Sequence, residues 1–208
     1  LNSELTLRNL QLERELEVLR NEVNELKRDS SYTERTLAAK LQELPVLSAH
    51  VVGNSITMRD NYITIDKGAK DGVKPRMGVV CGTGIVGIVS QVTDNYAVVM
   101  SVLNSKSSIS CRLRGSRYFG YLHWHGGNVL CATLDDIPRH ANFKLGDAVE
   151  TSGFSNVFPP GIFVGRIIQI RDSRDGLSYQ LMVQLSSDLA NVRDVAVILN
   201  DHDTNLVP

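Results

Sequence analysis

The sequence predicts a mainly β fold, an all-β sandwich or barrel, behind an N-terminal α-helical coiled coil. Leucines recur every seventh residue near the start of the chain, and from about residue 46 onward apolar residues alternate with a period of two. Short turn signals separate the alternating segments. The heptad pattern is typical of a coiled coil, and alternation between turns is typical of strands. We expect a coiled-coil helix over 1–45 and β-structure from residue 46 onward.

Residues 1–29 have the heptad pattern of a parallel two-stranded coiled coil, whose predicted dimer interface is Asn2, Leu5, Asn9, Leu12, Leu16, Leu19, Val23 and Leu26. Leucine fills position d, and asparagine, leucine or valine fills position a, which favours a dimer. Residues at position g and at position e of the next heptad are opposite in charge in three successive pairs, of which Arg8 with Glu13 is the first. The alternative is a single amphipathic helix lying on its own domain. The helix should continue until Pro45 ends it.

Length, charge and composition restrict the functional class. The 208 residues allow one large domain or two small ones, and a formal net charge of −1 gives no general attraction for nucleic acid. No stretch approaches the roughly 18 consecutive apolar residues that span a bilayer. Because the chain begins at Leu1, we expect a natural N-terminal part to precede it. Cys81, Cys111 and Cys131 form neither a metal-ligand spacing nor a disulfide framework.

Many short candidate strands follow the helix, with turn signals such as Asp71-Gly72, Gly126-Gly127 and Asp175-Gly176 between them. The expected strands cover residues 62–65, 77–81, 85–92, 97–103, 107–113, 119–124, 128–134, 147–151, 163–170, 179–185 and 194–199. Short strands without intervening helices indicate an all-β sandwich or barrel.

The stretch CGTGIVGIVSQV contains G-x-G-x-x-G at Gly82, Gly84 and Gly87. A dinucleotide-binding loop needs a helix directly after these glycines and an acidic residue about 20 positions later. Here a β-branched segment follows, and after Asp94 no acidic residue occurs before Asp135. The glycines therefore indicate a tight connection between two strands, and we expect no cofactor.

A loose internal repeat supports two β-units of related design. The paired stretches are 64–66 with 133–135, 73–74 with 143–144, and 84–92 with 161–170. Each unit is small, and together they contain enough apolar residues for a core.

The most specific signal is a series of short stretches in a fixed order. They are ITIDKGAKDGV at 63–73, Met77 with Val79 and Val80, GIVG at 84–87, GD at 146–147, TSG at 151–153, FPPGI at 158–162 and VG at 164–165. In order and spacing they resemble the family of the rod shape-determining protein MreC. Two departures concern local turn shape: Arg76 stands where that family usually has glycine, and Ile85 where leucine is commoner.

The resemblance implies a non-enzymatic scaffold of the bacterial cell-elongation complex, which builds the lateral cell wall. It implies one N-terminal helix in the inner membrane, before this chain, and a periplasmic body. It also implies two small β-barrel-like domains behind the coil, a first over 46–108 that is free to recruit a late strand and a second over 109–208. The implied partners are a second copy of the chain, a class B penicillin-binding transpeptidase, and MreD with other membrane proteins of the complex. The family offers no catalytic residue to assign.

A periplasmic adaptor of an efflux or secretion pump is the alternative, because such adaptors also join helical coil to β-barrel. They require an α-hairpin, and hence two heptad stretches flanking a β-domain. This chain has one heptad stretch.

Enzymatic and metal chemistry fit the sequence poorly. Ser152 lacks the preceding glycine of the G-x-S-x-G nucleophile motif. His123 and His125 would lie on one face of a strand as a zinc pair, but a third ligand would have to come from Cys131 or His140. We interpret the two histidines as exposed strand residues and expect no metal site.

The stretch CRLRGSRYFGYLHWH, at 111–125, combines arginines with four aromatic residues. Base stacking on RNA would use such a strand, but the near-neutral charge gives little attraction for phosphate. The ordinary interpretation is a hairpin with one aromatic face in the core. A third hypothesis, between RNA binding and a purely structural hairpin, is a protein-contact surface, because tyrosine, tryptophan and arginine are the usual interface anchors. Its candidate residues are Tyr118, Phe119, Tyr121 and Trp124.

Overall fold

The computed structural model describes residues 8, 11–12, 14–18, 20, 35–37, 39–173 and 176–199. The chain divides into two units, residues 1–36 and residues 37–208. The described residues of the first unit are helical, and Leu12 and Leu16 are exposed there. The other predicted coil contacts lie outside the described residues: Asn2, Leu5, Asn9, Leu19, Val23 and Leu26. The coiled coil therefore stays a prediction.

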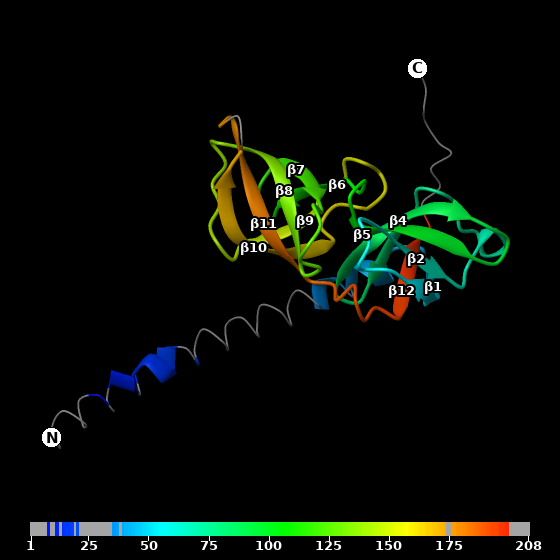
Figure 1. The fold of residues 1–208 in the computed structure, drawn as a ribbon, viewed down its shortest axis with the longest axis horizontal. Helices are drawn as coiled ribbons and strands as arrows, with labels where there is room; N and C mark the ends of the chain where they lie inside the picture. The colour runs from blue at the N-terminus through cyan, green and yellow to red at the C-terminus, as the bar shows by residue number, and fades with distance from the viewer. Residues whose placement is uncertain are drawn as a thin grey trace. The chain divides into compact units, whose positions relative to one another are not determined.

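The second unit begins with the end of a helix and continues as strands. Leu37 is buried in its hydrophobic core, and helical geometry ends at Gln42, before Pro45. The strands are β1 (Val46–Asn54), β2 (Asp60–Ile65), β3 (Gly78–Cys81), β4 (Gly84–Val92), β5 (Ala97–Asn104), β6 (Ile109–Leu113), β7 (Phe119–His123), β8 (Cys131–Pro138), β9 (Ala148–Thr151), β10 (Phe163–Asp172), β11 (Ser178–Leu185) and β12 (Asp194–Ile198). Figure 1 shows them as two groups joined by short connections. A 3-10 turn, η1 (Ala69–Asp71), lies between β2 and β3.

Two closed barrels result from antiparallel pairing of these strands. The first has the cyclic order β1-β12-β3-β4-β5-β2, and the second has the order β7-β6-β9-β10-β11-β8. The last strand in the described residues, β12, pairs with β1 and β3 and so completes the first barrel. Because both barrels are closed, neither has a strand whose whole edge is unpaired.

The internal repeat corresponds to equivalent positions in the two barrels. Ile65 pairs with Ala97 in the first barrel, and Leu134 pairs with Leu181 in the second. Farther along, Gly87 pairs with Ser101, as Gly165 pairs with Leu185. A β-bulge follows each of these glycines at the same distance, after Val89 and after Ile167. Sequence similarity and strand register thus agree.

The G-x-G-x-x-G stretch forms a hairpin, as expected. Cys81 pairs with Gly84, and Gly82 and Thr83 form the turn between β3 and β4. A Cβ atom on Gly87 would overlap the backbone carbonyl of Met100 on β5, which explains the glycine at that position. Among the described strands, β1 was not expected from the sequence, because its alternation is obscured by the apolar Val52 on the exposed face and by Gly53 on the inward face.

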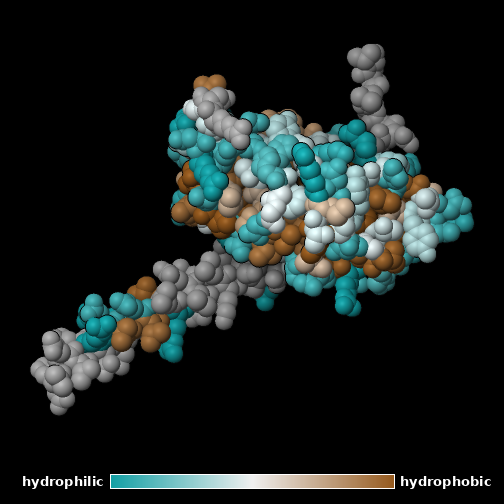
Figure 2. Space-filling view, viewed as in Figure 1, coloured by the Kyte–Doolittle hydropathy of each residue, from teal (hydrophilic) through white to brown (hydrophobic). Residues whose placement is uncertain are grey.

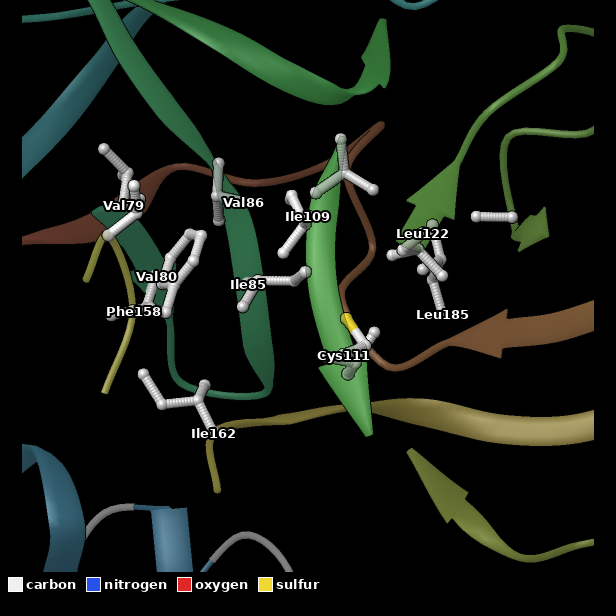
Figure 3. Packing of buried hydrophobic residues seen from close by; sticks show 14 of the residues in the cluster. Val79, Val80, Ile85, Val86, Ile109, Cys111, Leu122, Phe158, Ile162 and Leu185 are labelled. Atoms are coloured by element: carbon white, nitrogen blue, oxygen red, sulfur yellow. The ribbon is translucent and has the colours of Figure 1, made fainter. Parts of the chain in front are cut away.

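One hydrophobic cluster runs through both barrels. It includes Val79, Val80 and Ile85 of the first barrel together with Ile109 and Leu122 of the second (Figure 3). No helix in the described parts of the chain combines the length and the apolar character that crossing a bilayer requires.

The loop over 152–162, between β9 and β10, joins the barrels through Phe158. The Phe158 side chain is 2% exposed and belongs to the shared core. A Cβ atom on Gly78 of β3 would lie 2.7 Å from its ring, so the ring packs directly on the first barrel. Figure 3 shows Phe158 and Ile162 reaching toward Val80 and Ile85. The FPPGI stretch thus connects the two barrels.

Candidate protein-contact surface

Three aromatic side chains form an exposed group on the second barrel, which we call the aromatic patch: Phe119, Tyr121 and Phe154. Their exposed fractions are 37%, 42% and 71%. The rings of Phe119 and Phe154 are stacked with centroids 4.4 Å apart, and Tyr121 meets Phe119 edge-on at 6.5 Å. Figure 2 shows apolar residues on the molecular surface interleaved with polar ones. Exposed aromatic groups of this kind are characteristic of protein-contact sites.

Strand alternation positions two members of the patch. Along β7, Phe119 and Tyr121 face outward, whereas Gly120 and Leu122 are buried. A Cβ atom on Gly120 would overlap the backbone carbonyl of Asp135 on β8, so β7 lies close against β8 at this point. The barrel wall therefore holds both aromatic rings in fixed directions.

Hydrogen bonds position the third member, Phe154, in the loop over 152–162. The Ser152 hydroxyl donates to the backbone carbonyl of Ser110 on β6 at 3.2 Å, and the two serine hydroxyl oxygens are 2.7 Å apart. The Phe154 backbone N–H donates to the Ser152 hydroxyl at 3.2 Å. This short chain of bonds fixes the start of the loop and brings Phe154 over Phe119.

The structure separates the four aromatic residues that the sequence proposed for partner binding. Phe119 and Tyr121 are exposed together. Trp124 is 4% exposed, and its indole N–H donates to the backbone carbonyl of Asn128 at 2.9 Å. Placing Trp124 on the contact surface was therefore wrong, because its ring is part of the core. Tyr118 is half-buried and meets His140 edge-on at 5.0 Å.

Sequence reasoning missed Phe154, the most exposed ring of the patch. It lies in a polar loop without strand alternation, so no periodic pattern marks its direction. The only available signal was a large apolar residue among glycine, serine and asparagine in the stretch SGFSN.

A charged cluster borders the aromatic patch on the adjacent strands. Glu150 of β9 accepts hydrogen bonds from Arg112 Nε at 2.9 Å and from Arg114 Nε at 3.2 Å, and Arg112 Nη2 forms an ion pair with it at 2.8 Å. Arg112 also pairs directly across the sheet with Phe119 and, on its other side, with Glu150. Phe163 of β10 is the next cross-strand neighbour of Glu150. One row thus runs Phe119, Arg112, Glu150, Phe163 over four strands.

The helix end reaches the same region. The Lys40 ammonium donates a hydrogen bond to the backbone carbonyl of Pro160. A Cβ atom on Gly161 would overlap Lys40 Nζ and lie 3.9 Å from the Glu150 carboxyl carbon. Lys40 therefore links the helix end to the second half of the loop that carries Phe154.

A shallow groove lies beyond Tyr121, lined by His125, Thr133, Arg171, Gln180 and Met182. Tyr121 pairs across the sheet with Asp135, whose carboxylate accepts a hydrogen bond from Gln180 at 2.8 Å. The described residues include no group of three or more His, Cys, Asp or Glu side chains placed to hold a metal ion. The rings of His123 and His125 are 6.3 Å apart.

The nucleophilic side chains in this part of the barrel are engaged in structural contacts. Complete burial raises the pKa of the Cys111 thiol far above its ordinary value, so the thiolate that would react is not formed near neutral pH. The Ser152 hydroxyl lies against Ser110. The arrangement fits recognition of another protein better than covalent chemistry.

Comparison with known proteins places the fold. The family model described as "Rod shape-determining protein MreC, barrel core" matches residues 51–199. The cell shape-determining protein MreC of Listeria monocytogenes is 30% identical over 189 residues, covering 88% of this chain and 64% of the relative. The protein of the same name from Streptococcus pneumoniae is 27% identical, covering 79% of this chain and 62% of the relative. The chain therefore spans somewhat less than two thirds of these relatives.

Solved structures agree with this placement. The Listeria MreC structure matches with a TM-score of 0.70 at 29% identity, covering 89% of this chain and 90% of that one. A structure described as a complex between penicillin-binding protein PBP2 and MreC from Helicobacter pylori matches with a TM-score of 0.56 at 17% identity, covering 75% of this chain and 100% of the other, which supports the fold alone. The ordered motifs, the two closed barrels and the match over 51–199 lead to one conclusion: the chain belongs to the MreC family of cell shape-determining proteins and contains its barrel core.

Proposed function

We propose that this chain is the periplasmic part of a non-enzymatic scaffold in the cell-elongation complex, and that its aromatic patch docks a class B penicillin-binding transpeptidase. The observation that carries the proposal is the stacked, exposed pair of Phe119 and Phe154. Family membership supports the cell-shape role. The Helicobacter relative was solved in complex with a penicillin-binding protein, which supports this class of partner.

The patch has the physical properties of a binding anchor. Its rings are fixed by the β7 wall and by the Ser152 hydrogen bonds, so little conformational entropy is lost when a partner covers them. Buried aromatic residues commonly contribute about 2 kcal/mol or more each at such sites. A partner that covers Phe119 and Phe154 together would gain the greater part of its affinity there.

The N-terminal helix pairs two copies of the chain through the predicted heptad seam. Leu12 and Leu16, the described members of that seam, are exposed on a helix, as unpaired coiled-coil residues are in a single chain. A helix in the inner membrane precedes this chain, and MreD contacts the assembly near the membrane. A solved relative described as the major periplasmic domain of MreC supports the compartment.

Binding to the periplasmic part of the transpeptidase from the same organism, measured by interferometry at moderate salt, tests the docking proposal. We expect saturable binding by residues 1–208, and a loss of at least about tenfold in the Phe119→Ser, Phe154→Ser double variant. Tyr96→Ser is the matched control, because Tyr96 is an exposed aromatic on the first barrel. Equal binding by the double variant and the control would refute the docking surface.

Sedimentation of the whole chain against a chain that starts at Arg35 tests the coil. The shortened chain keeps Leu37, which is buried in the barrel core, and Lys40, which holds the loop over 152–162. We expect a dimer for the whole chain and a monomer for the shortened one. The same association state for both would refute dimerisation through the heptads. The pump adaptor has no support beyond its coil-and-barrel composition.

A further inference from the structure

The charged cluster beside the aromatic patch has more positive than negative charge. Two guanidinium groups, Arg112 and Arg114, share the single carboxylate of Glu150. The Glu150 side chain is 9% exposed, whereas the side chains of Arg112 and Arg114 are 36% and 32% exposed. The carboxylate therefore lies beneath the two cations, and the surface that an approaching partner meets is positive.

This positive surface is continuous with the aromatic patch. Arg112 is the direct cross-strand neighbour of Phe119, so the two side chains leave the same face of the sheet, with the Arg112 guanidinium turned toward Glu150. The guanidinium carbon of Arg114 lies 5.5 Å from the ring centre of Phe163, at the other end of the same row. On the opposite border, Asp135 is 16% exposed and bonded to Gln180. The exposed charge on the β6 side of the patch is thus positive, whereas Asp136 is an exposed carboxylate on the β8 side.

We infer that the segment which covers the aromatic patch carries an acidic side chain that meets Arg112 and Arg114, next to apolar or aromatic residues that pack on Phe119 and Phe154. This inference rests on the proposed docking function and specifies the chemistry of the partner. A guanidinium already oriented by Glu150 keeps further N–H donors for a second carboxylate. The occupant is a protein segment rather than an anionic lipid surface, because fixed, stacked rings beside two cations present shape as well as charge, and the chain has no general positive charge.

Glu150→Gln tests this inference, because it should strengthen partner binding, whereas a purely structural role of Glu150 would not. The amide keeps an oxygen that accepts a hydrogen bond, but the local charge becomes more positive by one. If the arginines bind a partner carboxylate, removing the competing negative charge should strengthen binding. If Glu150 only organises the arginines, its replacement should weaken binding or leave it unchanged.

The experiment measures the dissociation constant of residues 1–208 for the periplasmic transpeptidase domain at about 50 and 300 mM salt. We expect Glu150→Gln to bind about three- to tenfold tighter than the unchanged chain at low salt, and to lose that gain at high salt. Arg112→Gln should bind about three- to tenfold more weakly and with a flatter salt dependence. Circular dichroism and thermal unfolding confirm that both variants are folded.

The outcomes separate this inference from the docking function. Binding that depends on Phe119 and Phe154 but is unchanged or weaker in Glu150→Gln overturns the acidic partner and leaves docking intact. Binding that ignores Phe119 and Phe154 overturns docking itself. Arginine-dependent binding of the chain to phosphatidylglycerol vesicles without the transpeptidase would assign the surface to lipid, and arginine-dependent sedimentation as a larger assembly would assign it to a second copy. Each of these two results overturns the inference.

Discussion

The two barrels have the same cyclic strand arrangement but different connections. In the first barrel, the hairpin from β3 to β4 turns through Gly82 and Thr83. At the equivalent place in the second barrel, between β9 and β10, the loop over 152–162 is inserted. This loop directs Phe154 outward and Phe158 into the first barrel. The shared barrel thus supplies the frame, and one lengthened hairpin supplies both the most exposed ring of the aromatic patch and the joint between the barrels.

The barrels also differ in the strand that closes them. β12 lies between β1 and β3 in the first barrel, and β6 lies between β7 and β9 in the second. The closing strand of the first barrel therefore arrives from the end of the chain, after the second barrel is complete. The chain thus enters the second barrel from the first and returns to the first afterwards. Three sets of substitutions and a change of pH test how the two barrels depend on each other.

Phe158→Ala should have the largest effect, a loss of about 3–5 kcal/mol in the free energy of unfolding measured with urea. The ring is buried and packs on Gly78 of the other barrel, so its removal leaves a cavity at the joint. Phe154→Ala is the matched control from the same loop. Because Phe154 is exposed, its replacement should change stability by no more than about 0.5 kcal/mol. Similar losses for both variants would contradict the separate roles.

Gly84→Ala should cost about 1–3 kcal/mol by the same measurement. The new methyl group would overlap the Ser186 hydroxyl and lie 2.8 Å from the backbone carbonyl of Phe163, which belongs to the second barrel. A side chain at Gly82, two residues earlier in the same hairpin, would meet open space. Gly82→Ala should therefore be nearly neutral, and a neutral Gly84→Ala would show that the barrels do not approach closely there.

Arg76→Gly should raise the free energy of unfolding by about 0.5–1 kcal/mol. Arg76 has φ 71°, in the left-handed region, and its backbone N–H donates to the Val89 carbonyl at 2.8 Å. Gly146 occupies the equivalent position in the second barrel, with φ 88° and the matching bond to Ile167. The reverse test is Gly146→Ala, which should destabilise by about 1 kcal/mol although nothing lies near the new atom. A loss of stability in Arg76→Gly, or a gain in Gly146→Ala, would contradict the equivalence.

Acid should weaken contacts in the first barrel, with the smallest effect of the four changes. The hydrogen bond from the His50 backbone N–H holds the pKa of Asp66 below its ordinary value, and that from Gly68 does the same for Asp71. A carboxyl whose pKa is lowered by folding stabilises the fold above its ordinary pKa of about 4, and this contribution is lost as the pH falls through the lowered value. Unfolding measured between pH 6 and 2.5 should show this decline, and Asp66→Asn should make it shallower. An equally steep decline in Asp66→Asn would exclude Asp66 as a contributor.

Much of the fold was predictable from local patterns. The alternation of apolar and polar residues predicted the strands other than β1. The run of β-branched residues after Gly87 excluded a nucleotide-binding helix. The repeat predicted two related units, and the order of short motifs predicted the family. Of the residues named for partner binding, Phe119 and Tyr121 are exposed and Trp124 is in the core, while the exposed Phe154 was not foreseen. Partner binding by these residues stays a prediction.

The sequence by itself determined whether the apolar residues of each segment recur with the period of a helix or of a strand. This period depends on residues close together in the chain, because it reflects which side chains lie on the same face. Only the tertiary structure decided that β12 closes the first barrel, since pairing with β1 depends on residues far away in the chain. It also decided that Phe154 is exposed and Phe158 buried in one short loop. A loop has no periodic pattern, so the direction of each ring depends on its tertiary contacts. Hydrogen bonds to Ser152 position Phe154, and packing on the first barrel positions Phe158.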